Sequence, residues 1–137
     1  MNTIFKVGRY SLYFFSLGFL GFGLLFLVAP TTLTTLAEIS LPTPIALMEI
    51  RGVYGGFFIG AGLFLLICAW RESWLRPGMT AQAAILGGLV AARVLGLLID
   101  KSANTFLYLL LLSEIVGLII SIAVLRKFAV PTTQDLP

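Results

Sequence analysis

The stretch YSLYFFSLGFLGFGLLFLVA, residues 10–29, contains no charged side chain and is followed by Pro30. As an α-helix it extends about 30 Å, since each residue adds about 1.5 Å, and this length matches the hydrocarbon core of a bilayer. Proline interrupts a helix, so the segment has a defined end. A signal peptide would have a shorter apolar core and a cleavage site of small residues. The stretch therefore predicts a membrane-spanning helix.

Three further apolar runs follow, at residues 45–70, 80–99 and 106–125. Of the 137 residues in the chain, 59% are hydrophobic and 11% are charged, and the mean hydropathy is +1.05. Soluble domains usually have about a quarter of their residues charged. We therefore expect a single all-α membrane domain over residues 1–137, an integral four-helix bundle surrounded by the lipid bilayer, with a frayed tail at residues 129–137.

The basic residues outside the runs are distributed unevenly. Six of them lie before the first run, between the second and third runs, or after the fourth run. The other two connections contain one basic residue between them. The positive-inside rule then predicts that both termini are cytoplasmic. The six residues are Lys6, Arg9, Arg71, Arg76, Arg126 and Lys127, and the single one is Lys101.

The composition excludes several kinds of chemistry. The chain has no histidine and one cysteine, Cys68, which lies inside an apolar run. A His-ligated haem or zinc site, an imidazole base, an intrachain disulfide and an iron–sulfur cluster are therefore excluded, and no cofactor is expected. The net charge of +3 comes from residues scattered at the ends of the runs, so no nucleic-acid partner is expected either.

Four ionisable residues lie inside the apolar runs, where each charge costs about 2.5–3.5 kcal/mol on insertion scales. They come from three different runs, and counting about 1.5 Å per residue places all four roughly 7–15 Å below the outer boundary. Two are acidic and two are basic, so their formal charges cancel. We therefore predict a polar cluster in the outer half of the bundle, with Arg93 and Glu114 as its direct pair. The candidate site residues are Glu49, Arg51, Tyr54, Arg93 and Glu114.

Helix periodicity relates these residues to glycines. Glu49 shares a face with Gly52, Gly56 and Gly60, a ridge of small residues that allows close approach of another helix. About 200° around the same helix, the Arg51 face carries Tyr54, Gly55, Phe58 and Gly62. Such ridges fit packing inside one bundle, a homodimer face or a larger membrane complex. The predicted helix-packing residues are Gly52, Gly55, Gly56, Gly60, Gly88, Gly96 and Gly117.

The sequence EIRGVYGGFFIGAGL, residues 49–63, together with Arg93 and Glu114, resembles a family of small bacterial four-helix membrane proteins catalogued as a domain of unknown function. The likeness covers about residues 10–126, and its centre is Glu-x-Arg-x-x-Tyr-Gly-Gly. The resemblance implies a multi-pass protein of the bacterial inner membrane, and it implies no reaction.

Other small four-helix proteins offer weaker comparisons. Small multidrug transporters carry their essential carboxylate in the first helix, which has no charge here. Sterol-isomerase-like and sigma-receptor-like bundles hold a cationic amphiphile with buried acids, to which Glu49 and Glu114 are loosely similar. This likeness is an analogy only, since the aromatic and histidine patterns of those proteins are not present.

Three functions fit the sequence, beside a purely structural role for the charges. The first is a non-enzymatic module whose polar cluster binds a small amphiphile, a lipid headgroup or a quinone, or organises contact with a partner. The second is a proton-coupled transporter that acts as a dimer, with Glu114 changing its protonation. The third is an isomerase or hydrolase with Glu49 and Glu114 as an acid/base pair, although arginines beside the acids keep them ionised and oppose proton donation.

Overall fold

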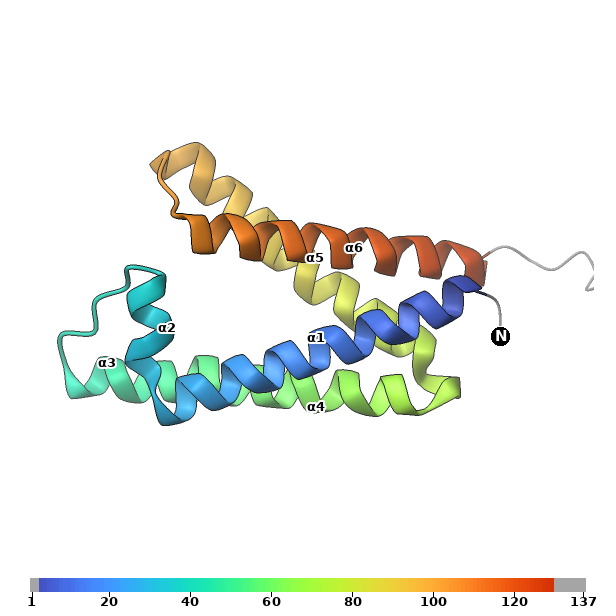
Figure 1. The fold of residues 1–137 in the computed structure, drawn as a ribbon, viewed down its shortest axis with the longest axis horizontal. Coiled ribbons are helices and arrows are strands. Elements are labelled where there is room, and N and C mark those ends of the chain that lie inside the picture. The colour runs from blue at the N-terminus through green and yellow to red at the C-terminus, as the bar shows by residue number, and fades with distance from the viewer. Residues whose placement is uncertain (1–2, 130–137) are drawn as a thin grey trace, which may run out of the picture.

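The computed structural model describes residues 3–129, and within this range the chain is helical without any strand (Figure 1). Four long helices dominate the fold, and short helical segments precede two of them. The elements are α1 (Thr3–Val28), α2 (Pro30–Leu36), α3 (Pro44–Glu49), a π-helical segment η1 (Ile50–Gly56), α4 (Phe57–Trp70), a 3-10 turn η2 (Glu72–Trp74), α5 (Leu75–Asp100) and α6 (Thr105–Ala129).

Four helical segments are long and apolar enough to cross a membrane, as in a multi-pass membrane protein. They are Thr3–Val28, Pro44–Trp70, Glu72–Asp100 and Thr105–Phe128. Many large apolar side chains on their outer surfaces are exposed, among them Val28, Trp70 and Leu98. Helices that are apolar on all sides are typical of membrane spans.

The helices begin and end at different residues from the predicted runs. Backbone hydrogen bonds continue past the end of an apolar run, so α1 begins at Thr3 rather than at residue 10. Similarly, α5 begins at Leu75 rather than at residue 80, because Pro77 lies in the first turn, where its missing N–H removes no helical hydrogen bond. The predicted tail at 129–137 lies outside the described residues, apart from Ala129, which belongs to α6.

Proline and threonine shape the connection between α1 and α3. The backbone turns at Ala29, with φ −132° and ψ 65°, and Pro30 then begins α2. Pro44 occupies the first turn of α3, where the Thr43 side chain accepts a hydrogen bond of 3.2 Å from the N–H of Ala46. These residues fold the connection into a short helix instead of an extended loop.

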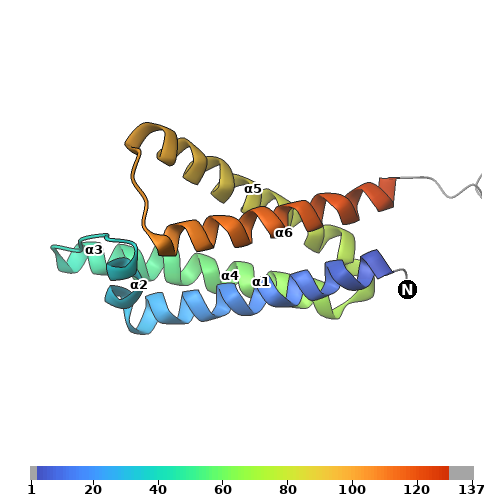
Figure 2. The same ribbon diagram turned by 45° about the horizontal axis from the view of Figure 1, so that its top comes forward.

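Figure 1 shows α1 side by side with α4, while α5 and α6 form a second hairpin. The beginning of α1, the turn η2 and the end of α6 lie at one end of the molecule, called here the terminus end. At the opposite end, called the α2 end, lie α2, α3 and the α5–α6 connection. Figure 2 gives the same arrangement from another side, with the C-terminal half of α5 leaning away from α1 and α4.

The side chains at the terminus end are tightly packed. A methyl group added at Gly8 would lie 2.9 Å from a Val124 methyl, and one added at Gly78 would lie 2.6 Å from Cβ of Cys68. Arg9 also lies 3.4 Å from a carboxylate oxygen of Glu72 there. The buried core consists of Leu12, Phe15, Phe19, Leu65, Cys68, Ala69, Leu75, Met79, Leu86 and Val124.

Helix α1 crosses η1 and α4 at glycines. A methyl group at Gly23 would lie 2.8 Å from the backbone nitrogen of Ile59, and one at Gly62 would lie 3.0 Å from the carbonyl oxygen of Ser16. At Gly55 the added group would lie 3.4 Å from the carbonyl oxygen of Gly23. The two backbones thus approach each other too closely for larger side chains on the Arg51 face.

The ridge on the Glu49 face is placed differently from our expectation. A methyl group at Gly52, Gly56, Gly60 or Gly88 would have no neighbouring heavy atom within 4 Å, so these residues pack against no other helix of the described chain. The helix turns its other small-residue face inward, and packing of this ridge against a partner stays a prediction.

Of the other predicted packing residues, Gly117 lies against Phe15 and Leu86, so it allows α6 to approach α1 and α5. Gly96, in contrast, has only the Asp100 side chain of its own helix nearby, at 3.8 Å, and therefore packs against no other helix.

Candidate functional site

The α2 end of the molecule contains a cavity of about 640 Å³, called here the aromatic cavity. Its walls come from α1, α2, the connection after α2, η1, α5 and α6, with one residue from α4. Apart from Arg93 and Glu114, the side chains that line it are uncharged and mostly apolar. Its aromatic residues are Phe14, Phe15, Phe19, Phe22, Phe26, Tyr54, Phe58 and Phe106.

One wall of the aromatic cavity is built around Phe58. Its ring lies parallel to that of Phe26, with centroids 6.1 Å apart and planes 9° apart, and it meets the ring of Phe19 at 5.2 Å and 62°. The Tyr54 ring lies 5.3 Å from that of Phe26. Aromatic contacts of this geometry add about 0.5–1.5 kcal/mol each beyond burial, so the wall is an ordered surface.

The π-helical segment η1 coincides with the IRGVYGG part of the quoted motif. Segments of π-helix in α-helices occur frequently at functional sites. Here Tyr54 lines the aromatic cavity, while Arg51 donates a hydrogen bond from Nε to the carbonyl oxygen of Leu27 at 3.1 Å. Arg51 itself is exposed and does not line the cavity. The motif therefore fixes the end of α1 and supplies one residue of the cavity.

Arg93 and Glu114 form the expected direct pair. Nε of Arg93 lies 2.9 Å from Oε2 and 3.2 Å from Oε1 of Glu114. Glu114 is only 5% exposed, whereas the Arg93 side chain is 28% exposed. A buried carboxylate is tolerated only with a charged partner, because an unpaired charge in low dielectric is very costly. The pair therefore places a neutral but strongly polar group on an otherwise apolar wall.

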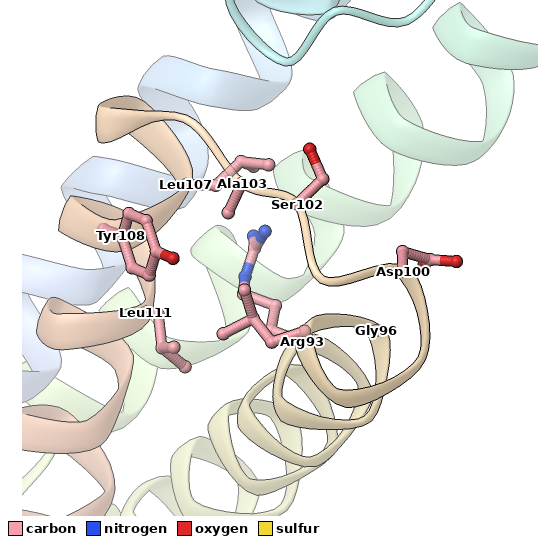
Figure 3. Close-up of a pocket in the computed structure, with 9 residues that line it drawn as sticks. Arg93, Gly96, Asp100, Ser102, Ala103, Leu107, Tyr108 and Leu111 are labelled. Atoms are coloured by element: carbon pink, nitrogen blue, oxygen red, sulfur yellow. The ribbon is translucent and has the colours of Figure 1, made fainter.

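Arg93 also borders a second cavity, of about 180 Å³, called here the small cavity. Figure 3 shows the guanidinium pointing into it beneath the α5–α6 connection, with the Tyr108 hydroxyl turned toward the guanidinium and Asp100 directed away. Besides these three residues, the small cavity is lined by Gly96, Leu97, Ser102, Ala103, Leu107 and Leu111. Arg93 and Leu107 line both cavities, which are therefore adjacent.

The predicted cluster of four charges does not form. Glu49 is exposed, lines neither cavity, and makes no ion pair with any residue in the described range. It lies on the outward ridge of small residues, whereas Tyr54 of the adjacent η1 lines the aromatic cavity. Glu49 and Glu114 consequently face no common cavity, so an acid/base pair of these two residues has no shared substrate site in this fold.

A buried amide network was missed in the sequence. Gln82 of α5 is completely buried, and its Nε2 donates to Oγ of Ser11 at 2.7 Å and to Oγ of Ser121 at 3.0 Å. Oε1 of Gln82 has no partner among the described residues. Its sequence signal was a lone amide side chain in an apolar run, with serines in two other runs. This network joins α1, α5 and α6 on the side of the aromatic cavity that faces the tightly packed terminus end.

A second missed residue joins the α5–α6 connection to α2. Nδ2 of Asn104 donates to the carbonyl oxygen of Leu36 at 2.8 Å and to Oε1 of Glu38 at 3.1 Å, while its Oδ1 accepts from the N–H of Leu107 at 3.0 Å. Asn104 thus caps the start of α6 and connects it by hydrogen bonds to the end of α2, beside the aromatic cavity. An asparagine before an apolar run is a recognisable helix-start signal, but its long-range partners leave no pattern.

A family model described as "Domain of unknown function (DUF4345)" matches residues 7–125. The chain belongs to this family. No curated protein and no solved structure matches the chain. Both cavities and the Arg93–Glu114 pair lie inside the DUF4345 region. Since the family description gives no activity, the function of this DUF4345 protein has to be inferred from its site.

Proposed function

We propose that this protein is a non-enzymatic membrane protein that binds one amphiphile. The apolar part of the ligand lies in the aromatic cavity, and its polar group lies against the Arg93–Glu114 pair. The observation that carries the proposal is the position of this pair, at the border between the large aromatic cavity and the small cavity.

The size and lining of the aromatic cavity support a small ligand. Ligand cavities typically measure about 300–1,000 Å³ and combine apolar walls with a few polar groups. The aromatic cavity lies within this range and has Arg93, Glu114, Thr34, Ser113 and Tyr54 among its lining residues. An acyl or isoprenoid chain, or a flat ring system, fits such a wall.

Selective binding of one ligand from a membrane depends on a polar group of that ligand. Apolar burial gives little advantage over lipid, because lipid tails are as apolar as the protein interior. A polar group of a ligand, in contrast, finds no hydrogen-bonding partner in hydrocarbon. Arg93 therefore provides the interaction by which the protein distinguishes an amphiphile from bulk acyl chains.

The fold favours binding over transport. The aromatic cavity occupies the α2 end, whereas the terminus end is closed by the core and by the Gln82 network. A transporter needs a second state that opens at the other end, and this end contains a fully buried Leu12 and Met79. By the positive-inside rule, the six basic residues listed above favour a cytoplasmic terminus end, and this orientation would put the aromatic cavity in the outer leaflet of a bacterial inner membrane.

The proposal is tested by filling the cavity. Gly18 lines the aromatic cavity, and a methyl group added there would meet no atom within 4 Å, so Gly18→Phe fills the space without a clash at Cβ. Gly21 has the same freedom but does not line the cavity, so Gly21→Phe is the matched control.

The probe is a diazirine-labelled palmitic acid, added to delipidated protein in mild detergent. We expect crosslinks at residues of the aromatic cavity, and a loss of about tenfold in Gly18→Phe, equal to about 1.4 kcal/mol of binding free energy. Gly21→Phe is expected to crosslink like the unchanged protein. Crosslinks spread evenly over the lipid-facing surface, or equal in both variants, would show that the cavity binds no ligand.

A further inference from the structure

We propose that the bound amphiphile is a phospholipid whose phosphodiester group lies in the small cavity, against the terminal nitrogens of Arg93. One acyl chain then extends into the aromatic cavity. This inference rests on the proposed function and specifies the ligand of that site.

Arg93 has unused hydrogen-bonding capacity. A guanidinium has five N–H donors, and the one on Nε is directed to Glu114. Neither terminal nitrogen donates a hydrogen bond to another residue of the described range, although both point into the small cavity (Figure 3). In a membrane such donors need a ligand or a lipid headgroup, because hydrocarbon supplies no acceptor.

A phosphate is chemically complementary to the Arg93 guanidinium. The two terminal nitrogens of a guanidinium match a pair of phosphate oxygens, and the resulting charge-assisted hydrogen bonds are about twice as strong as neutral ones. The Tyr108 hydroxyl is turned toward the same space, so one further donor is available to a phosphate, while the Ser102 hydroxyl is directed away from the guanidinium (Figure 3). The positions of Arg93 and Tyr108 make the small cavity an acceptor-binding site.

The charge beside the guanidinium favours a singly charged phosphate. Glu114 already neutralises much of the charge of Arg93. Asp100 also lines the small cavity, but its carboxylate is directed away from the guanidinium (Figure 3). A phosphomonoester carries about −1.5 to −2 charges at neutral pH and is repelled by Glu114 more strongly than a phosphodiester, which carries a single charge. Diester phospholipids therefore suit the site better than phosphatidic acid or free phosphate.

The two cavities differ in size and adjoin each other. The small cavity measures about 180 Å³ and the aromatic cavity about 640 Å³, so the phosphate suits the former and the acyl chain suits the latter. Arg93 and Leu107 line both cavities, so a headgroup at the guanidinium places its glycerol esters at the entrance of the aromatic cavity.

The experiment compares lipids that share the same two acyl chains and differ in whether they carry a phosphodiester headgroup. Delipidated protein in mild detergent is titrated with dipalmitoylphosphatidylcholine, dipalmitoylglycerol or inorganic phosphate, and retention is measured by native mass spectrometry. We expect the phospholipid to be retained at least about tenfold better than the diacylglycerol, a ratio that corresponds to about 1.4 kcal/mol. Inorganic phosphate alone is expected to be neither retained nor competitive.

Three variants separate the phosphate contact from folding. Arg93→Gln/Glu114→Gln removes both charges together, so that no unpaired charge stays buried, and phospholipid retention should fall to the level of the diacylglycerol. Tyr108→Phe keeps the ring and removes one donor, so retention should fall less. Lys101→Gln removes a neighbouring charge outside the small cavity and should change nothing.

Each alternative result has a definite meaning. Equal retention of both lipids would overturn this inference but leave the proposed function standing, because the tail alone would then be recognised. A phosphate preference that persists in Arg93→Gln/Glu114→Gln, or competition by inorganic phosphate, would also overturn it. Retention of neither lipid would overturn the inference and the proposed function together.

Discussion

Arg51 of η1 closes the end of α1 by donating a hydrogen bond from Nε to the carbonyl oxygen of Leu27, at 3.1 Å. The last carbonyls of a helix lack the N–H groups of a following turn, and α1 ends at Val28. Water cannot replace these donors inside a bilayer. A residue that the sequence suggested for ligand binding is therefore a capping side chain that connects two helices.

The first prediction concerns this cap. Arg51→Ala leaves the Leu27 carbonyl without its side-chain donor, so we expect a loss of about 1–3 kcal/mol in the free energy of unfolding. Arg51→Lys should restore part of the loss, since an ammonium is a donor without the planar geometry. Glu49→Gln is the control, because Glu49 is exposed and unpaired among residues 3–129. Thermal unfolding in nanodiscs measures the order of stability of the three variants. Equal stability of Arg51→Ala and Glu49→Gln would contradict the capping role.

The helices and one charge pair could be predicted because they depend on local rules. Apolar length gives the four spans, and the cost of a buried charge requires that Arg93 and Glu114 meet. Helix phase also showed that Glu49 and Arg51 face different neighbours. The local sequence does not determine which face of the second span packs against α1, since both of its faces carry small residues. That choice depends on the close contact of Gly23 with Gly55.

The cavities could not be predicted for a different reason. The aromatic cavity lies between α1 and the α5–α6 hairpin, whereas the small cavity lies between α5 and α6, so their volumes depend on how these helices pack at distant points. Gln82 binds Ser11 over 71 residues of sequence, and Asn104 binds Leu36 over 68. No periodic pattern marks such contacts, so the sequence indicated the polar residues of the site without the space around them.

The second prediction tests which glycines carry helix packing. In Gly23→Ala the new methyl group lies 2.8 Å from a backbone nitrogen, which cannot move like a side chain, so α1 and α4 must separate. We expect a loss of about 1–3 kcal/mol, the usual cost of overpacking. Gly60→Ala adds the same methyl group in open space and should unfold no more readily than the unchanged protein, because alanine favours a helix over glycine. The midpoint of unfolding in a denaturing detergent compares them, and the reverse order would show that the Glu49 ridge packs in a dimer.

The third prediction concerns the amide network. Gln82→Leu removes the hydrogen bonds to Ser11 and Ser121 but also removes the unpartnered Oε1. Ser121 keeps its hydrogen bond to the carbonyl oxygen of Gly117 at 2.8 Å. We therefore expect a modest loss of about 0.6–1.7 kcal/mol, as measured for polar contacts between membrane helices. Ser113→Ala is the control, since Ser113 bonds only within its own helix in the described chain, and a loss as large as that of Gln82→Leu would disprove a network effect.

The fourth prediction separates the two partners of the buried ion pair. Arg93→Gln leaves Glu114, which is 5% exposed, as an unpaired buried acid, so we expect a loss of about 3–5 kcal/mol. Glu114→Gln should cost less, because the Arg93 side chain is 28% exposed and can turn toward the small cavity. The double variant Arg93→Gln/Glu114→Gln should be more stable than Arg93→Gln, since its two side-chain amides can form a hydrogen bond without any buried charge.

The ion pair between Arg9 and Glu72 at the terminus end provides an exposed comparison for the Arg93 and Glu114 variants. Arg9 and Glu72 are 3.4 Å apart, but the Glu72 side chain is 75% exposed, so Glu72→Gln should cost about 0–1 kcal/mol. All variants are compared by unfolding in nanodiscs of one composition. If Arg93→Gln were no less stable than Glu72→Gln, Glu114 would have to be hydrated, and the border between the two cavities would be open to water instead of lipid.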